Sequence, residues 1–225
     1  MAESLYLLLP RFVFGRNEAL SERSEANLKL LLEIIAMTAE ELLDRYAAGE
    51  RDFRGVNLRR CDLSGTDLSG IKLDKANLHS IRLIEANLTK ASLRHVTLEG
   101  AKLSRGIFQE ADFSHANLGL TNLESANFQG AILEEAVMVN AFCQGTCFAY
   151  TNLKRAIMQQ ASVEDADFSY ADLRNAFLEE VTLRANLSNA DFRDAIIEVP
   201  IDHCFKFGVL CNTILPDGTV RNDDC

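Results

Sequence analysis

An apolar residue stands at every fifth position from Phe53 to Leu183, without a break. After a four-residue unit at Val181–Arg184, the spacing resumes at Leu187 and ends at Ile197, which makes thirty apolar centres in all. A period of five fits neither the 3.6 residues of an α-helix turn nor the two-residue alternation of a β-strand. The repeat therefore indicates a solenoid whose backbone turns a corner in each unit.

The position two residues before each centre is almost always small. It is Ala in eighteen of the thirty units, and Gly, Thr or Cys in six more. A favoured Asn or Asp stands between the small and the large residue, as in Ala76–Leu78, and the two positions after the centre are mostly polar, as in Lys154–Arg155. We expect the large side chain to fill the interior and the small one to let neighbouring walls approach. The Asn or Asp should face outward, and stacked coils should bond their backbones at the strand spacing of ~4.8 Å.

Two stretches carry a family resemblance. The runs ADFSHANLGLTNLESANFQGAIL and ADFSYADLRNAFL resemble the pentapeptide-repeat family, whose pattern is A(D/N)LXX, and the match covers residues 51–197. The resemblance implies an all-β solenoid, a right-handed quadrilateral β-helix with four pentads in each coil. The unit at Val181–Arg184 departs from the pattern, so we expect the last coil to be irregular.

The flanks are expected to cover the open ends of this β-helix, which would otherwise recruit other chains. We divide the chain into an N-terminal α-helical cap (1–50), the pentapeptide-repeat β-helix (51–197) and an irregular C-terminal capping tail (198–225).

Local signals support both caps. A capping box at Thr38–Glu41 predicts a helix that runs to about Ala48 and stops at Gly49. Before it, Ala26–Met37 is apolar enough for a second buried helix. In the tail, Pro216-Asp217-Gly218 predicts a turn. A helical N-terminus and a tail with this turn resemble the cyanobacterial members of the family.

The net charge of −10 lies mostly in the flanks. Residues 1–50 contribute −4 and residues 198–225 contribute −3, which leaves −3 for the central 147 residues. The resemblance implies one alternative function, a DNA-mimicking inhibitor of a type II topoisomerase, as some family members are. That function needs columns of acids along a wall, but here bases such as Arg94 and Lys154 interrupt the acids. This pattern argues against DNA mimicry and against nucleic-acid binding.

No catalytic or cofactor-binding motif is present, so we expect neither an enzyme nor a cofactor. His95 and His115 should stack one coil apart, with Glu135 above them. We expect a solvated polar ladder there rather than a metal site. His203 and the tail cysteines have spacings that fit no familiar zinc motif.

The six cysteines come without a secretory signal pattern, and no apolar run is long enough for a membrane-spanning helix. We therefore predict a cytoplasmic protein with mostly free thiols. The register makes Cys143 a core centre and turns Cys147 outward. Cys204, Cys211 and Cys225 lie outside the register, and for them free thiols are favoured over one tail disulfide.

The most specific signal is a set of apolar residues in outward places. Val137, Ile157 and Phe177 replace Asn or Asp in three successive coils, and Leu120 and Val139 should project from the same wall. Such a stack indicates a surface that something covers. The candidates are a terminal segment of this chain, a second copy of it in a homodimer, or another protein. We therefore expect a non-enzymatic scaffold or regulatory protein-binding module.

Overall fold

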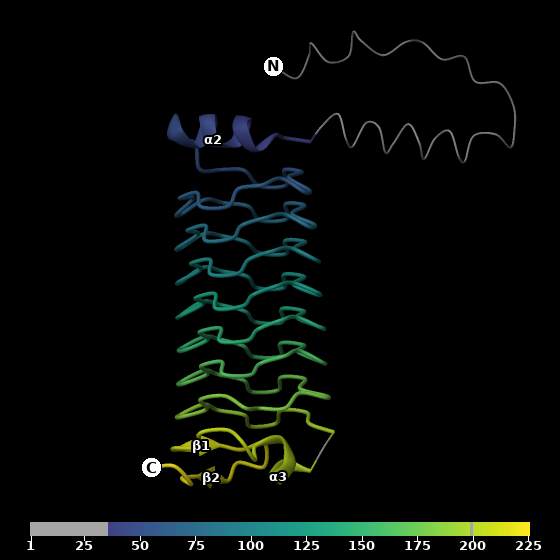
Figure 1. Cartoon of the computed structure of the whole chain (residues 1–225), viewed down its shortest axis with the longest axis vertical. Helices are drawn as coiled ribbons and strands as arrows, with labels where there is room; N and C mark the ends of the chain where they lie inside the picture. The colour runs from purple at the N-terminus through teal and green to yellow at the C-terminus, as the bar shows by residue number, and fades with distance from the viewer. Residues whose placement is uncertain (1–35, 199) are drawn as a thin grey trace, which may run out of the picture. The chain divides into compact units, whose positions relative to one another are not determined.

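The computed structural model describes residues 36–225 except Val199. Its main feature is a column of stacked coils, with helix α2 (Ala39–Ala47) at one end and α3 (Ile201–Cys204), β1 (Thr213–Ile214) and β2 (Val220–Arg221) at the other (Figure 1). The predicted second helix at Ala26–Met37 lies almost entirely outside the described residues.

The coils are joined by parallel backbone bridges between residues twenty positions apart. Asp52 bridges Lys72, Asn57 bridges Asn77, and the pattern continues to the bridge between Ile157 and Phe177. Bridges occur at every fifth residue, so each coil has four sides. The pairing agrees with the sequence-based expectation of four pentads per coil.

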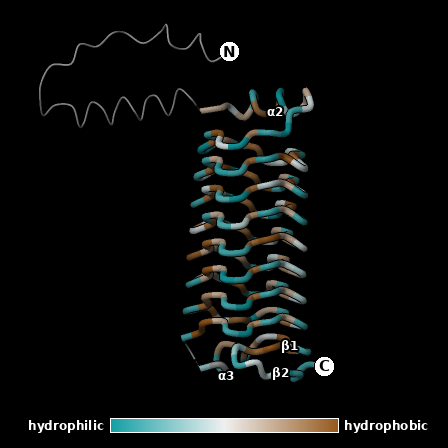
Figure 2. Tube along the Cα trace, turned by 180° about the vertical axis from the view of Figure 1, so that it is seen from behind, coloured by the Kyte–Doolittle hydropathy of each residue, from teal (hydrophilic) through white to brown (hydrophobic). Residues whose placement is uncertain are grey.

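From Leu68 to Ala195 both inward places are buried, as predicted, whereas Val56 and Cys61 in the first coil and Ile197 at the end are partly buried. The large centres and the preceding small residues form one continuous core, in which phenylalanines such as Phe128, Phe148 and Phe168 stack with ring centroids 5.0–5.6 Å apart. At Gly106 an added Cβ would lie 2.6 Å from Cε2 of Phe108, which explains a glycine at that small place. Along each coil, hydrophobic and hydrophilic residues alternate (Figure 2).

Each corner is a tight turn that closes with a backbone hydrogen bond. In one unit, Cys61 N donates to Leu58 O at 3.1 Å, and Arg60 between them has a φ of 61°. The equivalent residue has a positive φ in every unit from Gly55 to Glu180. β-Branched side chains fit this left-handed region badly. None of these described residues is Val, Ile or Thr.

The outward Asn or Asp side chain stabilises the turn that follows it. Asn117 Oδ1 accepts a hydrogen bond from Gly119 N at 3.0 Å, and Asp167 Oδ1 accepts one from Ser169 N at 3.0 Å. The preference for Asn and Asp at this place is therefore a turn-forming requirement of the backbone.

The four-residue unit at Val181–Arg184 disturbs the last coil, as the sequence predicted. Bridges that span it join residues nineteen apart, such as Asp167 and Asn186. Ala185, which follows the short unit, is not among the positive-φ residues. One residue fewer on one side shortens the coil without changing the register of the other three sides.

Helix α2 packs on the first coil. Thr38 caps it by accepting a hydrogen bond from Glu41 N at 3.1 Å, and Gly49 after the helix has a φ of 97°, as the capping signals predicted. Leu42 is fully buried, and Tyr46 Oη donates to Ser69 O at 2.8 Å. The helix therefore joins the core instead of standing apart from it.

The tail extends the pairing beyond the last coil. Val209 bridges Asn186, Ile214 bridges Asp191, and Leu183 N donates to Cys204 O at 3.1 Å. The predicted turn is present between β1 and β2: Gly218 N donates to Leu215 O, and Gly218 has a φ of 83°.

Candidate interaction surface

Three of the apolar residues singled out in the sequence form a column on one side of the β-helix. Val137 bridges Ile157, and Ile157 bridges Phe177, so each lies one coil from the next. Phe177 in turn bridges Ile196, which extends the column by one coil. We call these four residues the apolar column. We call the whole side the apolar wall, and its outward residues are Asn57, Asn77, Thr97, Asn117, Val137, Ile157, Phe177 and Ile196.

The side chains of the apolar column are open to solvent to different degrees. Val137, Ile157 and Phe177 are partly exposed, and Ile196 is 45% exposed. A valine, isoleucine or phenylalanine at this place cannot accept the hydrogen bond that Asn117 accepts from the following turn. The column therefore exposes apolar area and lacks a bond that Asn or Asp makes in half of the thirty units.

Outward apolar residues on other walls are isolated. Ile107 is 38% exposed but lies between Asn87 and Asn127, and Ile132 is 39% exposed between Asp112 and Asn152. A single exposed aliphatic residue is ordinary on a protein surface. Among the bridged residues, the apolar wall is the only wall that carries outward apolar residues in four successive coils.

Leu120 and Val139 lie in the turns that follow the apolar wall. Leu120 is 54% exposed with a φ of 57°, and its N–H donates to Val139 O at 3.0 Å. Phe142, 50% exposed, stands on the next wall just beyond Val139. Phe142 and Ile196 are not among the residues predicted from the sequence, although both occupy the Asn/Asp place, where the five-residue period indicates an outward side chain.

The tail does not extend the apolar wall. Its backbone bonds run to Leu183, Leu187 and Phe192, which lie on the three other walls. The other terminal segment predicted to cover the apolar column is the N-terminal one. Residues 1–35 of that segment lie outside the described residues.

The histidine ladder has the predicted geometry. The rings of His95 and His115 are parallel with centroids 4.7 Å apart, and His115 Nδ1 lies 3.2 Å from Glu135 Oε2. Arg155 Nη1 contacts the other oxygen of Glu135 at 3.1 Å. Among the described residues no group of three or more His, Cys, Asp or Glu is arranged to hold a metal ion.

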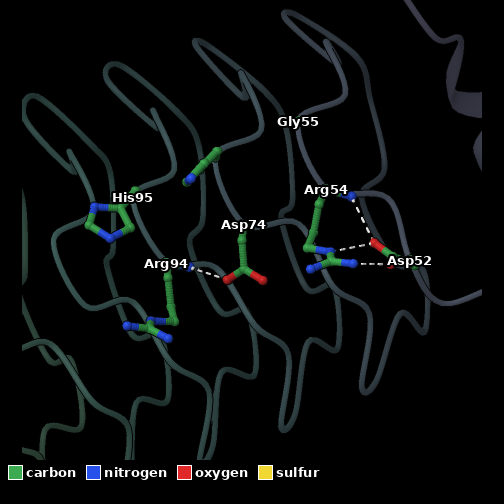
Figure 3. A pocket seen from close by; sticks show the side chains of 7 residues that line it. Asp52, Arg54, Gly55, Asp74, Arg94 and His95 are labelled. Carbon is green, nitrogen blue, oxygen red and sulfur yellow. Dashed lines mark hydrogen bonds and ion pairs between the residues drawn. The ribbon is translucent and has the colours of Figure 1, made fainter.

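A hollow of about 670 Å³ lies on the first three coils, beside His95 (Figure 3). Within it, Arg54 Nε donates to Asp52 Oδ1 at 2.8 Å, and the backbone N–H of Arg94 donates to Asp74 Oδ1 at 3.0 Å. Hydrogen bonding to Arg54 lowers the pKa of Asp52 to about 2.

The cysteines correct one expectation. Cys211 and Cys225 form a disulfide, so the prediction that tail thiols stay free is wrong for this pair. Cys211 and Cys225 lie after the last repeat unit. The five-residue period therefore does not predict the distance between their sulfur atoms. The hairpin of β1 and β2 brings them together. Cys143 is buried and Cys147 faces outward, as predicted.

Two family models match the repeat. "Pentapeptide repeat region" matches residues 51–128, and "Pentapeptide repeats (8 copies)" matches residues 116–149 and 146–184. The chain belongs to the pentapeptide-repeat family. Proteins of this family fold as right-handed β-helices, and neither matching model is that of an enzyme. No curated protein sequence matches the chain.

Several solved pentapeptide-repeat structures are similar to the chain. HetL, involved in heterocyst differentiation regulation in the cyanobacterium Nostoc sp. strain PCC 7120, is 28% identical over 82% of this chain and 100% of its own, with a TM-score of 0.26. A pentapeptide repeat protein of the Arabidopsis thaliana thylakoid lumen is 28% identical over 53% of this chain and 73% of its own, with a TM-score of 0.33. The fluoroquinolone resistance protein QnrB1, plasmid-mediated, is 19% identical over 68% of this chain and 80% of its own, with a TM-score of 0.32.

The described helices are too short or too polar to cross a membrane.

Proposed function

We propose that this pentapeptide-repeat protein is a non-enzymatic scaffold or regulatory module that binds protein through its apolar wall. The observation that carries the proposal is the replacement of the turn-forming Asn or Asp by Val137, Ile157, Phe177 and Ile196 in successive coils. Covering apolar area stabilises a complex by roughly 25 cal/mol per Å². A protein partner supplies such a cover.

The rigid core supports this role. The outward residues stand on walls whose interior is packed throughout, so they keep fixed positions relative to one another. A surface that is already ordered loses little entropy on binding. We further propose that α2 and the tail cap the ends of the β-helix, so that the chain consists of an N-terminal cap (1–50), the β-helix (51–197) and a C-terminal tail (198–225). We also propose that the protein acts in the cytoplasm.

The test compares proteins captured from the native source by three baits and identified by mass spectrometry. The first bait is the parent, and the second carries Ile157→Asp and Phe177→Asp. The third carries Asn127→Asp and Asn152→Asp, which add the same charge on two other walls. Partners held by the first and third baits but lost by the second support the proposal. Equal recovery by all three contradicts it.

The second bait should remain folded, because both substitutions point outward while Met158 and Leu178 beside them stay in the core. An unchanged far-ultraviolet circular dichroism spectrum and cooperative melting verify this.

The alternative function, DNA-mimicking inhibition of a type II topoisomerase, has less support. Neighbouring carboxylates on a wall, such as Asp172 and Asp191, are each contacted by arginine: Arg174 Nη2 lies 2.8 Å from Asp172 Oδ2, and Arg193 lies 2.6 Å from Asp191. A mimic of the phosphate backbone needs unpaired negative charge in a regular row. The purified protein should leave supercoiling by gyrase unchanged, and a dose-dependent loss of supercoiling would restore this alternative.

A further inference from the structure

The apolar column lies between two hollows of opposite charge. One, of about 380 Å³, is lined by Lys154, Arg174, Asn175, Arg193 and Asp194, and we call it the basic hollow. The other, of about 220 Å³, is lined by Val139, Gln159, Gln160, Glu179 and Glu180, and we call it the acidic hollow.

The two hollows flank the same coils on opposite edges of the apolar wall. Lys154 and Arg174 stand in the turns just before Ile157 and Phe177, whereas Gln159 and Glu179 stand in the turns just after them. Phe177 thus has a basic side and an acidic side at the same height along the β-helix, whereas the turn before Val137 carries Glu134 and Glu135.

The carboxylates of the acidic hollow have no cation beside them among the described residues. Glu179 accepts a hydrogen bond from Gln159, and Glu180 accepts one from Gln160 at 2.8 Å. Amide donors leave the negative charge of both groups uncompensated. The site therefore favours a partner that brings cations to this edge.

The cations of the basic hollow remain accessible. Lys154 and Arg174 contact Asp172 on the neighbouring wall, at 3.2 and 2.8 Å. The side chain of Arg174 is still 37% exposed, and that of Arg193 is 49% exposed. Arg174 Nε also lies 3.7 Å from Asp191 Oδ2, but a guanidinium has five N–H donors and can bind a further carboxylate.

We propose that the partner on the apolar wall is a second copy of this chain, lying parallel and face to face about a two-fold axis that runs along the β-helix. This rotation sets column against column at equal heights and exchanges the two edges of the wall. The basic hollow of each copy then faces the acidic hollow of the other. The inference rests on the proposed protein-binding role of the apolar wall.

The antiparallel alternative is electrostatically unfavourable. A two-fold axis across the wall would keep each edge opposite its own kind, placing Arg174 near the partner's cations and Glu179 near the partner's carboxylates. Like charges that face each other across an interface select against that arrangement. Charge therefore determines the orientation, and the apolar column contributes the contact area.

The first experiment swaps charges and measures mass by sedimentation equilibrium. One variant carries Glu179→Lys and Glu180→Lys, and a second carries Lys154→Glu and Arg174→Glu. We expect the parent to be dimeric at about 0.1 mM, where a Kd on the order of 10 µM gives mostly dimer. Each variant alone should dimerise at least tenfold more weakly, and an equimolar mixture should form a heterodimer.

The matched control carries Lys72→Glu and Lys102→Glu, which change the charge equally on two other walls and should leave the dimer intact. Cooperative melting of every variant separates loss of association from loss of folding. A parent that stays monomeric at about 0.1 mM, or a mixture that stays monomeric, overturns the proposed dimer. Loss of captured partners by the Ile157→Asp and Phe177→Asp bait would still support the broader binding role.

The second experiment tests orientation. Asn117 lies on the apolar wall one coil before Val137. In the parallel dimer it faces its own counterpart, so Asn117→Cys should yield a disulfide-linked dimer on mild oxidation, beyond the background of the parent. In an antiparallel dimer centred on the column the two sulfur atoms would be several coils apart. A dimeric variant without the cross-link contradicts the parallel arrangement.

Discussion

The rings of Tyr150 and Tyr170 lie parallel, with centroids 4.7 Å apart, on the outside of the β-helix. Both side chains are more than half exposed. Residues twenty positions apart in this chain therefore touch through their side chains as well as their backbones. The surface columns of the β-helix follow from this relationship.

The core register predicts a sharp contrast between neighbouring residues. Leu118 is fully buried, whereas Asn117 faces outward and bonds to Gly119 N. Leu118→Asp would bury a charge and should cost more than about 4 kcal/mol, which abolishes cooperative folding. Asn117→Ser, its control, should cost less than about 1 kcal/mol. Thermal melting measures the stability of both variants. Equal melting temperatures for the parent and Leu118→Asp would show that the assigned register is wrong.

The positive φ of Leu120 predicts an unusual order of stability. A non-glycine residue in the left-handed region costs about 1 kcal/mol, and Asn tolerates it better than most. Leu120→Asn should raise the free energy of unfolding by about 0.5 kcal/mol. Leu120→Val should lower it by at least about 1 kcal/mol, because a β-branched side chain fits this region poorly. Urea unfolding measures both, and a valine variant more stable than the asparagine variant contradicts the turn geometry.

Asp172 predicts a loss of stability in acid. Burial acts to raise the pKa of this carboxyl, but hydrogen bonds from Arg174 and Lys154 outweigh it, and the pKa lies below its usual value. A depressed folded-state pKa stabilises the protein above the unfolded-state pKa of about 4, and the contribution is lost as pH falls through the folded-state value. Unfolding free energy should thus be nearly constant from about pH 7 to pH 5 and decline below about pH 4. Asp172→Asn should show a shallower decline, and identical acid profiles would exclude this role.

The disulfide predicts a thiol count. The sequence has six cysteines, and the bond between Cys211 and Cys225 leaves four thiols: Cys61, Cys143, Cys147 and Cys204. Protein unfolded without reductant should therefore give four equivalents with Ellman's reagent, and six would refute the disulfide. In the folded protein Cys143 and Cys204 should react slowly, since burial raises both thiol pKa values, that of Cys204 to about 11.

Reduction should loosen the tail and spare the repeat. The bond closes a segment with a sequence separation of 14, for which loop-closure entropy corresponds to about 3 kcal/mol. Cys225→Ser should therefore increase proteolysis within the tail while the repeat core remains resistant. Cleavage in the repeat at the same rate as in the tail would contradict this independence.

The sequence by itself determined the register of this protein. The five-residue period shows which side chain of each unit fills the core, which turns outward and where the unit at Val181–Arg184 shortens the coil. It determined these features because each five-residue unit needs one large and one small buried residue. This local requirement recurs in too many units to arise by chance. The stacking of Val137, Ile157 and Phe177 followed once the pentapeptide-repeat resemblance supplied four units per coil.

Only the tertiary structure determined the contacts between long surface side chains and the contacts at the ends of the β-helix. The opposed hollows around Arg174 and Glu179 depend on which long side chains bond to which neighbours, and side-chain rotamers are not encoded in a five-residue period. Cys211 and Cys225 meet because the hairpin of β1 and β2 folds against the last coil, a contact outside the repeat. A periodic sequence determines contacts between neighbouring units, whereas bonds across corners and at the ends depend on the assembled chain.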